Sequence, residues 1–93
     1  MKNKHQKILK KAAHKLGYEN SLDKCIEECS ELIHELVKLK KGTSNKNRTI
    51  SEMADVELTM TKLRLFIDKN GEKYRNSLKS SFRRLNDYLE KTA

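Results

Sequence analysis

The stretch that decides the fold is residues 20–42, NSLDKCIEECSELIHELVKLKKG. Asn20 or Ser21 at its start is a good N-cap, and Asp23 in the first turn favours a helix N-terminus. Gly42 at its end suits the left-handed position that commonly closes a helix. In between, apolar side chains recur every three or four residues, as on one face of a helix. We therefore expect a helix over about residues 20–41 with the apolar stripe Leu22, Cys25, Ile26, Cys29, Leu32, Ile33, Leu36 and Val37.

The same reasoning divides the rest of the chain into further helices. The chain has no proline, and Gly17, Gly42 and Gly71 each follow a stretch with helical periodicity. Three helix stops give four helices, at about residues 3–16, 20–41, 49–69 and 72–91. Short connections favour antiparallel neighbours. The expected fold class is all-α, a four-helix antiparallel bundle.

Size and composition indicate one small domain, residues 1–93, that completes its core by oligomerisation. Of its 93 residues, 35% are hydrophobic and 37% are charged. A chain this short buries a limited share of its surface, so its core is marginal when alone. No run is apolar enough to span a bilayer and no secretory signal is visible, so we expect a cytoplasmic protein without membrane contact.

Charge and cysteine content narrow the classes of partner and site. The net charge of +8 indicates acidic partners, such as nucleic acid, an anionic surface or phosphorylated small molecules. Cys25 and Cys29 are the only cysteines, so there is neither a disulfide framework nor a four-thiolate zinc site. We interpret both as small apolar core residues.

Five acids form the most unusual pattern of the chain. Glu27-Glu28-x-x-Glu31 is followed, after twenty residues, by Glu52-x-x-Asp55. Acids three residues apart share one side of a helix, because successive side chains rotate by about 100°. Two such helices facing each other offer several carboxylates to one hard cation, and oxygen-only ligands suit Mg²⁺ or Mn²⁺ rather than zinc.

The position of these acids relative to the apolar stripes leaves two interpretations open. Glu28, Glu31 and Glu35 fall in one strip beside the stripe of their helix, and Glu52 and Asp55 fall in a comparable strip. We therefore expect the acids at the edge of the packing faces. Carboxylates held together repel and raise one another's pKa unless a cation neutralises them. Spacing alone fits a metal site and two solvated helix faces equally well.

The acidic motif and its surroundings resemble the MazG-like, all-α nucleoside triphosphate pyrophosphohydrolases, most of all the short single-domain members of phages and bacteria. The segments DKCIEECSELI (23–33) and ISEMADV (50–56) carry the resemblance, which extends over residues 14–90. Enzymes of this family cut between the α- and β-phosphates, giving a nucleoside monophosphate and pyrophosphate. The resemblance implies a Mg²⁺-dependent hydrolase with Mn²⁺ as the other candidate metal, a role in nucleotide-pool house-cleaning, and a homodimer or homotetramer whose sites draw residues from two chains.

Carried over by position, the resemblance also implies roles for individual acids. Glu27 matches the first acid of the motif, which orients a ligand or helps to activate water. The general base that takes a proton from water is Glu27, Glu31 or Glu35. The residues that resemble the family's Mg²⁺ ligands are Glu28, Glu31, Glu52 and Asp55.

A triphosphate also needs cations. Lys79 and Arg83 lie four residues apart on the expected last helix, with Arg75 one turn earlier, and the family places a Lys/Arg pair on this helix. Arg48, one turn before Glu52, matches a position that is often basic in the family. Arginine suits phosphate because its planar fork donates two parallel hydrogen bonds.

The base of a nucleotide commonly stacks on an aromatic side chain, and the chain has few aromatic residues. Tyr18 and Phe82 are candidates for stacking on a base, and both also fit a role in packing. Family members often have Gln near the position of Ser21. The shorter hydroxyl here changes the base contacts, or Asn20 takes its place.

Two other classes of protein compete with this interpretation. Glu31-x-x-His34 has the form used by di-iron bundle proteins, but its partner here is Glu52-x-x-Asp55 rather than a second Glu-x-x-His. The other class is a basic nucleic-acid-binding or protein-interaction module without catalysis. The lysines of residues 2–15 support it, whereas no base-reading cluster stands out.

Overall fold

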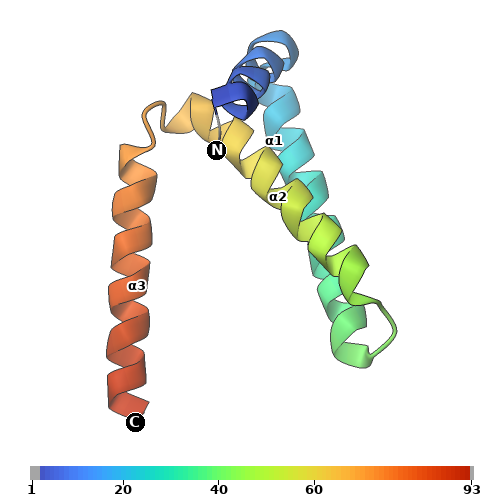
Figure 1. The fold of residues 1–93 in the computed structure, drawn as a ribbon, viewed down its shortest axis with the longest axis vertical. Coiled ribbons are helices and arrows are strands. Elements are labelled where there is room, and N and C mark those ends of the chain that lie inside the picture. Colours follow the sequence, from blue (N-terminus) through green and yellow to red (C-terminus); the bar gives the residue numbers. More distant parts are fainter. Residues whose placement is uncertain (1–2, 93) are drawn as a thin grey trace.

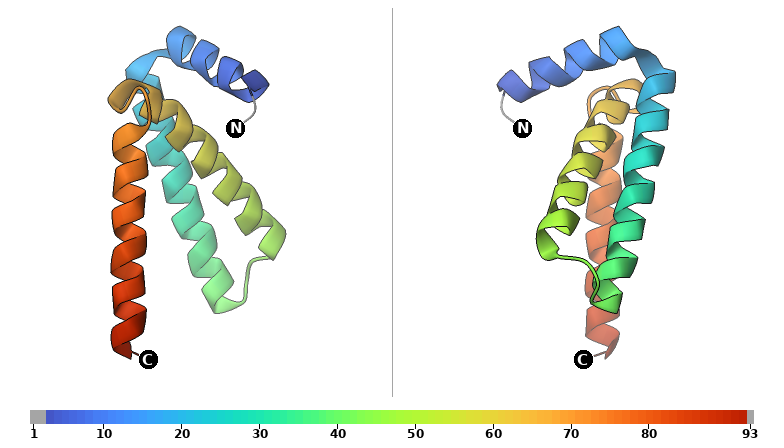
Figure 2. Two further views of the ribbon diagram at one scale, coloured as in Figure 1. Left: turned by 60° about the vertical axis from the view of Figure 1, so that its left-hand side comes forward. Right: turned by 90° about the vertical axis from the view of Figure 1, so that its right-hand side faces the viewer.

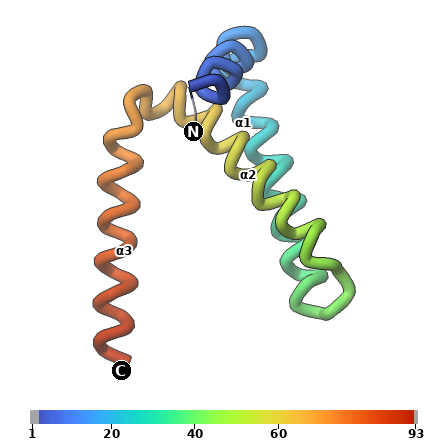
Figure 3. Tube along the Cα trace, in the orientation of Figure 1, coloured from blue at the N-terminus to red at the C-terminus, as the bar shows by residue number. Residues whose placement is uncertain are grey.

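The computed structural model describes residues 3–92, which form three helices (Figure 1; Figure 3). These are α1 (Asn3–Lys41), α2 (Lys46–Ile67) and α3 (Glu72–Thr92). No strand occurs in this range, so the all-α fold class is confirmed. No helix of the described part is long and apolar enough to cross a membrane. The expected domain also includes residues 1, 2 and 93, which lie outside the described range.

The first two expected helices form one element that bends at Gly17, so the expected four helices become three. Gly17 has φ 85° and ψ 172°, a backbone conformation that glycine adopts without a Cβ clash. The buried Ser21 hydroxyl donates a hydrogen bond of 3.0 Å to the Gly17 carbonyl. Asn20 and Ser21 therefore lie inside the helix rather than at an N-cap.

The bend turns residues 3–16 across the end of α2, as the two views of Figure 2 show. Leu9 and Ala13 of this N-terminal arm are the buried hydrophobic side chains among residues 3–92. Leu9 and Lys10 line a groove together with Arg64 and Leu65 of α2. The arm thus covers the second half of α2 with its few buried apolar atoms.

A tight polar loop connects α1 to α2. Gly42, with φ 77°, donates its backbone N–H to the Leu39 carbonyl, and Thr43 donates to the Lys38 carbonyl. This pair of bonds is the Schellman arrangement that satisfies the last carbonyls of a helix. The Asn45 side chain then accepts from the backbone N–H of Arg48 at 2.9 Å. This cap explains why α2 begins at Lys46, earlier than expected.

α3 lies apart from the hairpin that α1 and α2 form (Figure 1). The Asp68 carboxylate accepts from the Tyr74 N–H at 2.8 Å, and the Asn70 side chain accepts from the Glu72 N–H at 3.1 Å. In the described range α1 and α2 are the only helices whose Cα atoms come within 8 Å of one another. One chain therefore forms an antiparallel helical hairpin and a separate third helix, and the expected bundle is not closed within it.

Polar side chains are the most buried residues of segment 18–41 and of α2, and half-buried apolar residues lie beside them. Five of the polar side chains are buried, and Glu28 and Glu52 are half-buried with one carboxylate oxygen each shielded from solvent. Positions seven apart lie in line along a helix, because seven residues make about two turns. We call this set the polar seam; its members are Ser21, Glu28 and Glu35 on α1, and Thr49, Glu52, Thr59 and Lys62 on α2.

Only part of the expected apolar stripes is buried, and several of their large side chains are exposed. Ile26 is 63% exposed, Ile33 is 62% exposed and Phe82 on α3 is 63% exposed. Other members, including Leu22, Leu32, Val56 and Leu63, are half-buried. The expectation of a continuous apolar core was therefore wrong in part, because buried polar side chains take some of its positions and part of the apolar surface stays exposed in the described part of the chain.

We predict that Gly17→Ala lowers the free energy of unfolding by about 1–2 kcal/mol, because a Cβ is disfavoured at this positive φ. Urea unfolding followed by circular dichroism measures the change. Lys15→Ala, an exposed substitution in the same arm, serves as the control and should change stability little. Unchanged stability of Gly17→Ala would show that the bend is not a required feature.

Candidate functional site

The acidic residues of the sequence motif meet across the polar seam. Glu28 is the central member, because it belongs to two groups of three acids. In the first group one carboxylate oxygen from each of Glu27, Glu28 and Glu31 lies within 4.8 Å of the others. In the second, Glu28 meets Glu52 and Asp55 of α2 within the same distance. The structure thus brings together all five acids that the sequence singled out.

Burial and mutual repulsion raise the pKa of two of these acids. The pKa of Glu28 is raised above its usual value first by burial and then by the charges of Glu31, Asp55 and Glu27. The pKa of Glu52 is raised by burial and then by Glu31, Glu28 and Asp55. These carboxylates therefore hold a proton more readily than exposed ones do.

The shielded oxygens of this cluster fit a hard cation. The Oε2 atoms of Glu28 and Glu52 are buried and have no hydrogen-bond partner in the described structure. A buried carboxylate oxygen without a donor is costly, and a divalent cation would satisfy it. Glu28 and Glu52 were expected at the edge of the packing faces; they lie within the seam because polar residues occupy it.

Glu27 lies at the outer side of the cluster. Its carboxylate accepts from the Lys24 ammonium at 3.2 Å, and its side chain is 51% exposed. Glu31 is also exposed, and its charge contributes to the raised pKa of both Glu28 and Glu52. Both acids are therefore accessible to solvent water beside the shielded oxygens.

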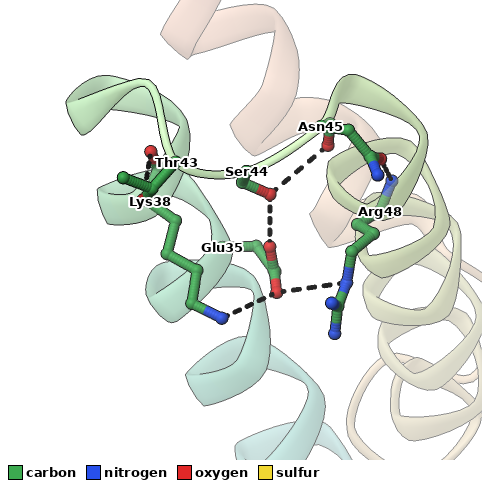
Figure 4. Close-up of polar contacts among 6 residues, drawn as sticks. All are labelled: Glu35, Lys38, Thr43, Ser44, Asn45 and Arg48. Atoms are coloured by element: carbon green, nitrogen blue, oxygen red, sulfur yellow. Dashed lines mark hydrogen bonds and ion pairs between the residues drawn. The ribbon is translucent and has the colours of Figure 1, made fainter.

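Glu35 lies one helical turn beyond Glu31 and belongs to a different group of contacts (Figure 4). It is buried, and its carboxylate accepts a hydrogen bond of 2.6 Å from the Ser44 hydroxyl. Its other oxygen lies 3.7 Å from the Lys38 ammonium and 3.6 Å from Nε of Arg48. The Ser44 bond, then the charges of Lys38 and Arg48, hold the pKa of Glu35 below its usual value. These contacts make Glu35 a weaker base than a glutamate with the usual pKa.

An open groove connects the acid cluster with the residues around Glu35. It runs between α1 and α2 near the loop, so it reaches both the acid cluster and the contacts of Glu35. Of the substrate-binding residues expected from the sequence, Arg48 lies in this groove. Lys38 was not expected there. The groove is lined by Ser30, Glu31, His34, Glu35, Lys38, Arg48 and Glu52.

The expected cations of α3 do not reach the acids within one chain. Arg75 donates to the Asn70 carbonyl at 3.5 Å, and Arg83 donates to the Ser80 hydroxyl at 3.2 Å. Lys79 is exposed on the same helix. Because α3 stands apart from the hairpin, their assignment to the triphosphate stays a prediction that depends on a second chain.

Tyr18 and the two cysteines take packing positions. The Tyr18 ring lies against Phe66 with centroids 5.5 Å apart and an interplanar angle of 50°, at the end of the hairpin near Gly17. Cys25 and Cys29 are free and half-buried. Burial, together with Cys25, raises the pKa of the Cys29 thiol, so this residue favours the neutral form that packing requires.

Sequence reasoning missed Lys62, which is 8% exposed on the seam side of α2. Lys62 follows Asp55 by seven residues, and Thr59 follows Glu52 by seven. This spacing of about two helical turns is visible in the sequence and could have indicated Lys62. The same spacing also relates Ser21, Glu28 and Glu35. Counting polar residues at sevens would have indicated the seam.

Comparison with known proteins adds no evidence about the site beyond its geometry. No family model, no curated protein and no solved structure matches the chain.

We predict a specific acid dependence of stability from Glu35. A carboxyl group with a lowered folded-state pKa stabilises the protein above its unfolded value near 4.5, and this contribution is lost as the pH falls through the folded value. Glu35→Gln should therefore lose less stability than wild type between about pH 5 and pH 3. Thermal unfolding over this range measures it. Glu19→Gln, at an exposed position, is the control; parallel curves for wild type and Glu35→Gln would contradict the prediction.

Proposed function

We propose that the protein is a Mg²⁺-dependent nucleoside triphosphate pyrophosphohydrolase. The observation that carries the proposal is the pair of acid groups that share Glu28, with unpartnered, shielded oxygens on Glu28 and Glu52. The resemblance of the motif to MazG-like enzymes points to the same chemistry. A net charge of +8 around an acidic centre suits an anionic substrate that binds together with a cation.

In the proposed reaction the acidic residues have two roles, holding the metal ion and accepting a proton. Glu28, Glu31, Glu52 and Asp55 would hold Mg²⁺ or Mn²⁺, which supplies charge neutralisation at the phosphate oxygens. Water attacks the α-phosphorus, a new P–O bond forms, and the bond to the β-phosphate breaks to release pyrophosphate. An exposed carboxylate beside the shielded oxygens, Glu27 or Glu31, accepts the proton of this water.

A second copy of the chain would complete both the fold and the site in this proposal. α3 carries an unpartnered apolar stripe that includes Leu78, Phe82 and Leu85, and the hairpin leaves Ile26 and Ile33 exposed. Packing α3 of one chain on the hairpin of another would bury these side chains. The same packing would carry Lys79 and Arg83 toward the acids of the partner.

We predict that the purified protein with Mg²⁺ releases pyrophosphate, not orthophosphate, from one or more members of a panel of NTPs and dNTPs. Glu28→Gln and Asp55→Asn should lower kcat/KM by about 100-fold or more, since each removes a charged cation ligand. Chelation with EDTA should abolish turnover. The measurement separates the two phosphate products by ion-exchange chromatography.

Matched controls are available on the same helices. Asp23→Asn on α1 and Glu57→Gln on α2 neutralise exposed acids outside both acid groups, so their kcat/KM should stay near that of wild type. Release of orthophosphate alone, or full turnover in Glu28→Gln, would reject the proposal. A salt-sensitive shift of DNA mobility without Mg²⁺ and without turnover would favour the nucleic-acid-binding alternative.

A subunit-mixing experiment tests the shared site. We predict that Lys79→Ala raises KM, and that refolding it with inactive Asp55→Asn restores low-KM activity in about one quarter of the sites, because random pairing gives mixed dimers with one intact site each. Mixing Lys79→Ala with itself is the control. Unchanged KM in Lys79→Ala removes Lys79 from the site, and a raised KM that mixing does not restore places Lys79 and the acids in one chain.

A further inference from the structure

Glu35 brings two cations of different elements together. Lys38 is on α1 and Arg48 on the first turn of α2, yet both approach the same carboxylate oxygen, at 3.7 Å and 3.6 Å. Figure 4 shows the two side chains converging on Glu35 from opposite sides, with Ser44 on the other oxygen. A buried carboxylate thus gives two long side chains, one from each helix, a shared ion-pair partner.

Both cations keep hydrogen-bond donors for a ligand. Arg48 uses Nε toward Glu35, and its side chain is 67% exposed. In the described structure no contact involves its two terminal nitrogens, which are the pair that recognises phosphate through parallel hydrogen bonds. The Lys38 side chain is 38% exposed, and its ammonium carries three donors while it forms an ion pair with Glu35 at 3.7 Å.

The groove places these donors beside the acid cluster. Lys38 and Arg48 line it at the end next to the loop, and Glu31 and Glu52 line it as well. In the other direction along the hairpin, Tyr18 packs on Phe66. A chain of phosphates that starts at the acids therefore finds cationic donors toward the loop.

We infer that Glu35 is a positioning residue that holds Arg48 and Lys38 as a two-cation oxyanion subsite for the β- and γ-phosphates of the substrate. The identity of this ligand rests on the proposed function. The geometry of the subsite does not, because it follows from the contacts of Glu35 and from the groove.

Two effects of Glu35 on anion binding have opposite signs, which makes the inference testable. As a negative charge, Glu35 repels phosphate, so its neutralisation would strengthen anion binding. As a positioning group, it spares the ligand the entropy cost of ordering two long side chains, so its neutralisation weakens binding. The exposure of Arg48 screens the charge effect, and we therefore expect positioning to dominate.

The experiment measures binding of inorganic pyrophosphate, the expected product, by isothermal titration calorimetry in Mg²⁺. We expect Kd to rise about five- to tenfold in Glu35→Gln and in Arg48→Gln, for the loss of one or two ordered donors. With a nucleotide that the enzyme cleaves, Glu35→Gln should raise KM by a similar factor and leave kcat within about twofold.

Ser44→Ala is the matched control for a merely structural role. It removes the hydrogen bond that ties the loop to Glu35 but keeps both ion pairs, so pyrophosphate binding should stay within about twofold of wild type. Lys40→Gln controls for the loss of one positive charge on α1 outside the groove.

Clear outcomes overturn the inference. Equal or tighter pyrophosphate binding by Glu35→Gln does so, and so does equal weakening by Ser44→Ala. If Glu35→Gln does not fold, Arg48→Gln and Lys38→Gln decide, since both positions are solvent-accessible; unchanged binding in both rejects the subsite. Pyrophosphate binding that depends on Glu35 without any nucleotide turnover would reject the proposed function and keep the subsite.

Discussion

The structure depends on the polar seam between α1 and α2. Two amphipathic helices normally bury their apolar sides against each other, whereas here the most buried side chains of residues 18–41 and of α2 are serine, threonine, lysine and glutamate, and the apolar residues beside them are only half-buried. Carboxylates that approach within 4.8 Å of one another repel, and the pKa values of Glu28 and Glu52 are raised first by burial and then by this repulsion. A bound cation would convert the repulsion into attraction, so folding and cation binding are linked through the same oxygens.

The polar seam also affects which side chains remain exposed on the rest of the surface. With the polar sides turned inward, large apolar side chains remain on all three helices. Fully burying one Ile or Phe gains about 1.5–3 kcal/mol. The buried apolar side chains of the described chain, Leu9 and Ala13, offer little of this gain. In the proposed dimer, burial of these exposed apolar side chains would supply the driving force for self-association.

The sequence predicted the local structure better than the packing. Gly17, Gly42 and Gly71 all adopt positive φ, so each marks a real change of chain direction. Helix content also followed from spacing, whereas for the five acids spacing alone fitted a shared site and two solvated helix faces equally well. The side of each helix that faces its neighbour could not be predicted from spacing. An apolar stripe indicates that a helix needs a packing partner, but it does not indicate which element that partner is. Glu35 shows the same limit for the site: its strip could be read from the sequence, but its contacts with Ser44 and Arg48 depend on how the loop folds back.

The order of charges along the hairpin gives the site a direction. The acid cluster occupies the middle of the seam, the cations held by Glu35 lie toward the loop, and Tyr18 with Phe66 closes the end near Gly17. An anion alone is repelled by the middle and attracted only at the loop end; an anion accompanied by a divalent cation is attracted along the whole groove. In the proposed function, this arrangement would favour metal complexes of phosphate compounds over the free compounds. Lys38 and Arg48 pair with Glu35 rather than with the acid cluster, and the Oε2 atoms of Glu28 and Glu52 have no hydrogen-bond partner in the described structure.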